Sequence, residues 1–208
     1  MPLLCADQRS DGWFAVRRYR ITASIAAGCL GLHPHMSRQE AWRRSLGIEK
    51  DSSNERTRWG EQYEQTAKEA YEVETGRFIE PTGFWVSRVY DWLGASPDGF
   101  VGTDGLYEGK APGKLPEAVP VYHRIQMIVQ MIVCERAWCD YFVWVPEREG
   151  ECGEPIGGTF LRRVHLAGAA GIIRKLEAFY RTYVLTETEP PRKKAKRRRK
   201  VGFKGDLP

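Results

Sequence analysis

The sequence lacks long apolar runs and is poor in cysteine, and each absence excludes a class of protein. No stretch of eighteen or more apolar residues occurs, so we expect no membrane-spanning helix. The chain does not start with a basic segment followed by a long apolar one, so we expect no signal peptide. The five cysteines are odd in number and include no Cys-x-x-Cys pair, which argues against a disulfide framework or a structural zinc site and favours a reducing compartment.

Positive charge is scarce in most of the chain, although the net charge is +5. Nine of the 32 basic residues, but one of the 27 acidic residues, lie in 192–208, which leaves 23 basic and 26 acidic residues in 1–191. The body of the chain therefore has a net charge of −3. This balance does not fit a general nucleic-acid coat, so DNA binding would need positive charge that is placed locally.

The chain divides into one domain and a tail. Its length and its 42% of hydrophobic residues fit a single globular domain, which we place at residues 1–186. Glutamate and proline followed by basic residues predict a disordered tail at 187–208. The basic run at 192–200 resembles a nuclear-import signal and would place the protein in the nucleus of a host cell; otherwise we expect it in the cytoplasm. A nonspecific DNA-binding arm and a tag fused by an experimenter are the alternatives.

Hydrophobic periodicity, caps and turn residues predict a mixture of helices and strands. Helices are expected at 11–20, 22–31, 37–46, 54–75, 121–134 and 168–185. Strands are expected at 78–87, 92–101, 106–111, 138–145 and 159–166, the first three as an antiparallel meander. This order indicates an α/β or α+β fold around a mixed sheet.

One stretch combines two carboxylates with an amine. Asp98 follows a proline at a turn, and Glu108 and Lys110 lie two apart on a strand, so their side chains project from the same face. A hairpin between residues 98 and 108 would bring Asp98 beside that pair. Two hard oxygen ligands suit Mg²⁺, with Mn²⁺ as a possible substitute. The metal would stabilise charge on a phosphate, and the lysine would orient or deprotonate the attacking water.

Simpler explanations exist for each part of this pattern. A Glu-x-Lys pair by itself is more often a salt bridge on an exposed strand, and the Pro-Asp-Gly at hairpin distance is what favours a metal site. A third carboxylate could come from Glu61 or Glu64 on the helix at 54–75, where an ordinary solvated glutamate is the alternative.

Five motifs follow one another along the chain: Arg17-x₃-Ile21-Thr-Ala-Ser24, Gly60-Glu-Gln-Tyr-Glu64, Ala95-Ser-Pro-Asp-Gly99, Glu108-Gly-Lys110 and Gln126-Met-Ile-Val-Gln130. In this order and spacing they resemble the lambda exonuclease family, also called YqaJ-like viral recombinases, and the match covers roughly residues 13–145. The resemblance implies a PD-(D/E)xK, restriction-endonuclease-like α/β core, in which helices flank a central mixed β-sheet.

The resemblance also assigns roles to individual residues. Three carboxylates would lie at the metal: Asp98, Glu108 and Glu64. Lys110 would serve the attacking water. Four side chains would match the family's pocket for the 5′-phosphate of a DNA end: Arg17, Ser24, Ser96 and Gln126. Arginine gives forked donors to a phosphate, and hydroxyl and amide groups supply neutral donors.

The function implied is a Mg²⁺-dependent 5′→3′ exonuclease on double-stranded DNA ends, which leaves 3′ single-stranded overhangs for viral-type recombination by strand annealing. The resemblance further implies a ring-shaped homotrimer, a single-strand annealing protein as partner and no membrane association. Two alternatives stay open: a structure-selective or RNA-cleaving endonuclease on the same core, and a noncatalytic module that binds DNA ends.

The chain departs from the family pattern at three places. Ala111 stands before Pro112, where the family often has Cys or Thr. Gly109 stands between Glu108 and Lys110 in place of the usual Leu, Ile or Val, and we expect it to weaken the strand. The second glutamine, Gln130, comes four residues after the first rather than two. None of these changes removes a catalytic group.

Overall fold

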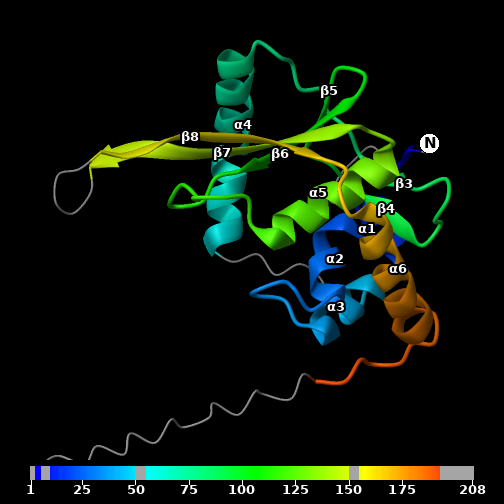
Figure 1. Ribbon diagram of the computed structural model, residues 1–208. Helices are drawn as coiled ribbons and strands as arrows, with labels where there is room; N and C mark the ends of the chain where they lie inside the picture. The colour runs from blue at the N-terminus through cyan, green and yellow to red at the C-terminus, as the bar shows by residue number, and fades with distance from the viewer. Residues whose placement is uncertain (1–2, 6–9, 50–54, 150–154, 193–208) are drawn as a thin grey trace, which may run out of the picture.

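The computed structural model describes residues 3–5, 10–49, 55–149 and 155–192, which form two small mixed sheets flanked by helices (Figure 1). The α/β fold expected from the sequence is confirmed, with two sheets where one central sheet was expected. In the described part of the chain, no helix is both long enough and apolar enough to cross a membrane.

The first sheet has the strand order β1-β3-β4-β2. Its strands are β1 (Leu3–Cys5), β2 (Ile21–Thr22), β3 (Phe84–Val86) and β4 (Leu93–Ala95). Neighbours are antiparallel except β2 and β4, which run parallel. The strand expected at 92–101 is interrupted after Ala95, since Pro97 has no N–H to donate to a ladder. The interruption turns the chain from the first sheet into the second.

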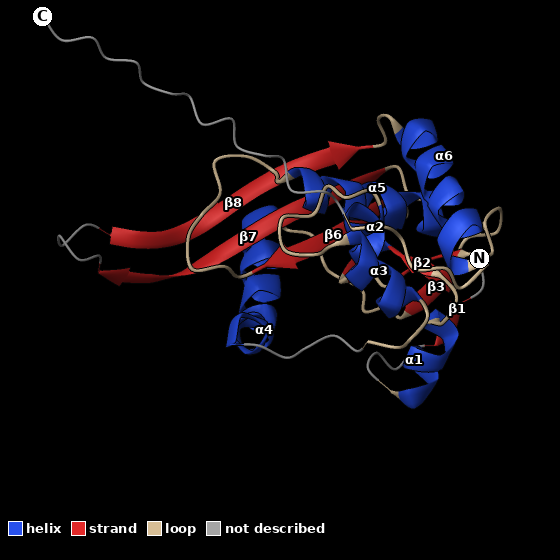
Figure 2. Ribbon diagram, turned by 90° about the horizontal axis from the view of Figure 1, so that it is seen from below, coloured by secondary structure: helices blue, strands red, loops and turns tan. Residues whose placement is uncertain are grey.

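The second sheet has the order β5-β6-β7-β8 and includes Glu108 and Lys110. Its strands are β5 (Gly99–Val101), β6 (Gly105–Lys110), β7 (Trp138–Glu149) and β8 (Pro155–His165). Only β6 and β7 are parallel among its neighbours. The β7–β8 hairpin is longer than the other strands and projects from the body as a two-stranded ribbon (Figure 2).

Helices form at each of the places predicted from the sequence. They are α1 (Asp11–Arg17), α2 (Ala23–Cys29), α3 (Arg38–Ser45), α4 (Glu55–Thr75), α5 (Val121–Cys134) and α6 (Ala169–Phe179), the last continued by a π-helical turn, η1 (Tyr180–Val184). Ser37 caps α3 as expected, because its hydroxyl accepts a hydrogen bond from the Glu40 amide at 3.1 Å. Helix α1 ends earlier than predicted, as Tyr19 has a positive φ of 58°.

Two helices cover the opposite faces of the second sheet. Helix α4 places Tyr71 against Tyr107 of β6 and Phe142 of β7. Helix α5 lies on the other face, where its apolar side chains join the main core with residues of α2 and β4 (Figure 2). Because successive strand residues alternate between faces, Glu108 and Lys110 point toward α5 while Tyr107 and Gly109 point toward α4.

The described end of the chain folds back on the body. Tyr19 donates a hydrogen bond to Glu187 at 3.1 Å, and Arg43 forms an ion pair with Glu189. Pro190 is buried. Residues 187–192 of the predicted tail are therefore next to the domain, and residues 193–208, which include most of the basic run, lie outside the described residues.

Candidate active site

The β5–β6 hairpin brings Asp98 beside Glu108 and Lys110, as the sequence predicted. Gly99 pairs with Tyr107, so Asp98, just before β5, meets the end of β6. Its Oδ2 atom accepts a hydrogen bond from the Gly109 amide at 2.9 Å. The backbone of the strand that carries Glu108 and Lys110 thus also holds Asp98.

Glu108 is the most enclosed group of the site, with 0% of its surface exposed. Its Oε1 atom accepts hydrogen bonds from Lys110 Nζ at 2.5 Å and from Gln126 Nε2 at 2.7 Å, and its Oε2 atom accepts one from Gln130 Nε2 at 2.7 Å. An ionised group is this deeply buried only where charge and hydrogen bonds compensate it. The burial of Glu108 contradicts the alternative of a salt bridge on an exposed strand.

Helix spacing explains why both glutamines reach the same carboxylate. Gln126 and Gln130 are four residues apart on α5, about one helical turn, so both lie on the face that meets β6. This spacing of four residues between the glutamines differs from the spacing of two in the family pattern. A signal for this arrangement is present in the sequence, because two glutamines one helical turn apart stand in a mostly apolar helix.

The charges at the site are unbalanced toward the negative. Burial raises the pKa of Asp98 to about 7, and the nearby Glu108 carboxylate adds to this effect, while Lys110 opposes it. Burial alone would lower the pKa of Lys110, but Glu108 and Asp98 outweigh it and raise that pKa, which keeps the ammonium charged. One ammonium does not fully compensate two carboxylates, and an added cation would favour the ionised form of Asp98.

This donor set fits a divalent ion with hard oxygen ligands. Asp98 and Glu108 supply carboxylate oxygens, and Mg²⁺ typically takes one or two carboxylates and completes its shell with water and substrate phosphate. Among the described residues, no three His, Cys, Asp or Glu side chains are grouped closely enough to cage a metal by themselves. Two carboxylates, those of Asp98 and Glu108, are therefore the candidate protein ligands at this point.

Glu64, the third carboxylate expected at the metal, lies on α4 with 51% of its side chain exposed. It forms an ion pair with Lys68 at 2.9 Å, yet it is close enough to Asp98 to contribute to the raised pKa of that residue. Glu64 is therefore at the edge of the site, and its role as a ligand stays a prediction. The side chain of Glu61, the other possibility, lies outside the described residues.

Two of the residues predicted to bind a 5′-phosphate are linked through Trp13. The Arg17 guanidinium lies 3.7 Å from the centre of the Trp13 ring, and the Trp13 indole N–H donates to Ser96 Oγ at 3.1 Å. Ser96 is two residues from Asp98, so this group is close along the chain to one of the candidate metal ligands. Trp13 was assigned no role from the sequence, although its i, i+4 spacing from Arg17 on α1 places both on one helix face.

The other two predicted phosphate ligands come from different helices. Ser24 lies in the first turn of α2, is exposed and contacts Thr22 Oγ1 at 3.2 Å through its own hydroxyl. Gln126 is half-buried and binds Glu108. Trp13 therefore links Arg17 with Ser96, while Gln126 contacts Glu108 and Ser24 contacts Thr22.

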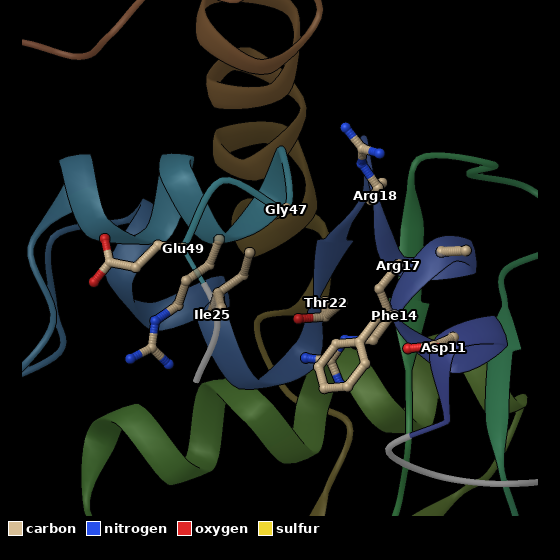
Figure 3. Close-up of a pocket in the computed structure, with 10 residues that line it drawn as sticks. Asp11, Phe14, Arg17, Arg18, Thr22, Ile25, Gly47 and Glu49 are labelled. Atoms are coloured by element: carbon tan, nitrogen blue, oxygen red, sulfur yellow. The ribbon is translucent and has the colours of Figure 1, made fainter. Parts of the chain in front are cut away.

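A cavity of about 280 Å³ opens beside Arg17 (Figure 3). Phe14, Arg17 and Asp11 of α1 form one side of it and Ile25 and Glu49 lie on the other, with Thr22 between them. Arg18 and Arg44 also line it. Three arginines against two carboxylates give this cavity a local positive charge that the body as a whole lacks, and such a place suits an anion.

A second polar pair that the sequence did not reveal lies next to Lys110. His123 Nδ1 and the Tyr141 hydroxyl are 2.8 Å apart. Burial, reinforced by the nearby Lys110 charge, lowers the pKa of His123 to about 3, so its ring is neutral. His123, Gln126 and Gln130 together form a polar stripe on α5 that faces the catalytic strands.

The comparison with protein families decides the ancestry of the chain. Residues 12–137 match the model of the YqaJ-like viral recombinase domain. The chain belongs to this family. A search of curated proteins finds no match.

Solved structures agree with the family assignment. An alkaline exonuclease, LHK-Exo, from Laribacter hongkongensis is 28% identical with a TM-score of 0.68, over 86% of this chain and 95% of that one. The crystal structure of LHK-Exo in complex with dAMP is similar at 29% identity, with the same TM-score and coverage. A phage-related exonuclease from Haemophilus somnus 129PT is 11% identical with a TM-score of 0.58, over 84% of this chain and 98% of that one, and shows the fold alone.

These findings confirm three expectations from the sequence. The YqaJ-like family is confirmed, as is a fold of the PD-(D/E)xK nuclease type. The expected enzyme class, a deoxyribonuclease of the exonuclease type, is confirmed with them. Nucleases of this family generally use divalent metal ions.

Proposed function

We propose that this YqaJ-like protein is a Mg²⁺-dependent exonuclease that digests double-stranded DNA from the 5′ end and leaves 3′ single-stranded overhangs for recombination by strand annealing. One observation carries the proposal: Asp98, Glu108 and Lys110 converge on one point, and two glutamines of α5 hold the buried Glu108.

Asp98 and Glu108 would hold the divalent ion, with Mn²⁺ as a substitute for Mg²⁺ and Glu64 at the edge of the site. When bound, such an ion stabilises charge on the phosphate and lowers the pKa of a bound water. Gln126 and Gln130 orient the Glu108 carboxylate through their amide N–H groups. The Lys110 ammonium, which lies against Glu108, would donate a hydrogen bond to the attacking water or to a phosphate oxygen.

Recognition of the DNA end would depend on Arg17, Ser24, Ser96 and Gln126 as the phosphate pocket. Trp13 supports this assignment because it fixes Arg17 by a cation–π contact and Ser96 by a hydrogen bond. A 5′-phosphate bound beside Asp98 would place the first phosphodiester bond near the metal ligands. This arrangement would favour 5′→3′ digestion of an end over cleavage within a strand.

A body with net negative charge would grip DNA best by enclosing it. We therefore propose a ring-shaped homotrimer around the duplex and a single-strand annealing protein that receives the 3′ overhang. Light scattering coupled to gel filtration measures the first: three copies per particle support the ring, and a monomer that digests DNA processively contradicts it.

The basic residues of 192–200 are proposed as a nuclear-import signal. Their composition is the support for this assignment, and a DNA-binding arm is the competing role.

The activity is tested on three DNA substrates in parallel: linear duplex with 5′-phosphates, the same duplex with 5′-hydroxyls, and closed circular duplex. Each is incubated with Mg²⁺ or with EDTA. The proposal predicts Mg²⁺-dependent loss of the linear substrates, fastest with the 5′-phosphate, and an intact circle. Cleavage of the circle would show an endonuclease, and binding of ends without digestion would show a noncatalytic module.

A further inference from the structure

Tyr107 lies directly before Glu108 on β6 and points to the opposite face of the sheet. Its ring packs against Tyr71 of α4 and Phe142 of β7, with ring centres 4.9 and 6.4 Å away. Only 1% of its surface is exposed. The ring thus belongs to the apolar layer between α4 and the sheet, but the hydroxyl at its end does not share that character.

The Tyr107 hydroxyl is buried, and among the described residues it has no hydrogen-bond partner. Almost all buried polar groups of folded proteins are hydrogen-bonded, and an exception needs a reason such as a catalytic role or a bound water or ion. A phenylalanine would fill the same space without this penalty. The hydroxyl therefore points to a function.

Gly109 shows where this hydroxyl lies. A Cβ atom added at Gly109 would be 2.5 Å from the Tyr107 oxygen, so no other residue fits at 109 while the ring keeps its place. The amide of Gly109 donates to Asp98 Oδ2. The Tyr107 hydroxyl and the Asp98 carboxylate therefore both lie against the same residue. The strand remains paired at this point, with Gly109 opposite Phe142.

The charged groups that act on the hydroxyl belong to the candidate site. After burial, the charges that raise the pKa of Tyr107 are, in order, those of Asp98, Glu108 and Glu64. Glu108 already accepts three hydrogen bonds, and Glu64 is paired with Lys68. Asp98 accepts one hydrogen bond among the described residues, from the Gly109 amide, so of these three carboxylates it has the most capacity to accept another.

We propose that Tyr107 is a positioning residue of the metal site: its hydroxyl donates a hydrogen bond to Asp98 through one water and holds this carboxylate in place for the divalent ion. Gly109 provides the space that makes the contact possible. The inference rests on the proposed metal site at Asp98 and Glu108. Groups that orient a metal ligand in this way typically change metal affinity by about 10- to 100-fold.

The test is a calorimetric titration of Mn²⁺ into the full-length protein without DNA. Tyr107→Phe keeps the ring and removes the hydroxyl, and we expect it to weaken Mn²⁺ binding roughly 10-fold. Tyr71→Phe is the matched control, because its hydroxyl donates to Asp140 at 2.9 Å in the same aromatic cluster. It should lower the melting temperature and leave the affinity for Mn²⁺ unchanged.

Gly109→Ala provides a second variant, since it keeps the hydroxyl but forces it from its place. It should weaken Mn²⁺ binding as well. Wild-type affinity in Tyr107→Phe overturns the inference while the metal site stands. A wild-type protein that binds no Mn²⁺ overturns the proposed metal site and the inference together, so the two failures are distinguishable.

Discussion

Gln130 offers a sharp test of how the site is held, because it touches Glu108 but neither DNA nor metal in the proposed mechanism. Its side chain is fully buried on α5, and its amide N–H reaches Glu108 Oε2 at 2.7 Å. The other end of the amide, Oε1, is buried without a hydrogen-bond partner among the described residues. Gln130→Leu replaces the amide with an apolar side chain of similar size.

The effects on stability and on activity should separate in this variant. A hydrogen bond to a charged group contributes about 1.5–3 kcal/mol, and the unpaired Oε1 that the substitution removes costs about 1–3 kcal/mol, so the two changes partly offset each other. Because the buried Glu108 Oε2 loses the donor Gln130 Nε2, the melting temperature should still fall modestly. Glu108 loses one of the two side-chain amides that orient it, and a loss of 1.5–3 kcal/mol at the transition state corresponds to roughly a 10- to 100-fold lower turnover.

The assay pairs thermal unfolding with initial rates on 5′-phosphorylated linear duplex at saturating Mg²⁺. Gln130→Glu serves as a companion variant of the same shape that adds a like charge beside Glu108, and it should reduce both stability and turnover. Wild-type turnover in Gln130→Leu would refute the orienting role. A large fall in its melting temperature would show that Gln130 matters for folding rather than for the position of Glu108.

Three further predictions concern pH, the DNA end and the tail. In EDTA the pKa of Asp98 in the folded state, about 7, lies above its pKa in the unfolded chain, so the folded state keeps a proton that the unfolded state loses. The free energy of unfolding should therefore fall as pH rises from about 4 to 7. Asp98→Asn should remove this slope, and an unchanged slope would contradict the burial of Asp98 beside Glu108. Arg17→Ala should slow digestion of 5′-phosphorylated ends far more than of 5′-hydroxyl ends, and equal slowing of the two would show a structural role. Deleting residues 193–208 keeps the contacts that residues 187–190 make with the domain. The truncated enzyme should therefore stay active on linear DNA, and a fluorescent fusion of it should no longer accumulate in nuclei. Loss of activity at low salt alone would instead identify a DNA-binding arm.

The convergence of Asp98, Glu108 and Lys110 could be predicted from the sequence because these residues are close along the chain. Asp98, Glu108 and Lys110 lie within one hairpin, and the period of a strand is enough to place the last two on one face. The positions of the helices followed from periodicity and caps for the same reason. Such features depend on neighbours along the chain and need no knowledge of the fold.

Contacts between distant segments were harder to predict. Trp13 and Ser96 are 83 residues apart, and nothing in the sequence indicates that an indole joins Arg17 to the strand that precedes Asp98. The contact of Gln130 with Glu108 also depends on how α5 packs against β6. The division into two sheets likewise depends on how the strands pair, which Pro97 suggests but does not determine.

The measurement closest to the central claim follows one duplex with a 5′-phosphate at one end and a 5′-hydroxyl at the other, each strand labelled at its 3′ end. Products are resolved over time for the wild type with Mg²⁺, the wild type with EDTA, and Asp98→Ala with Mg²⁺. The account predicts stepwise shortening of the 5′-phosphorylated strand with both 3′ labels retained in long products, and none of this with EDTA or without Asp98. Early release of the 3′ labels as mononucleotides, or digestion by Asp98→Ala near the wild-type rate, would contradict it.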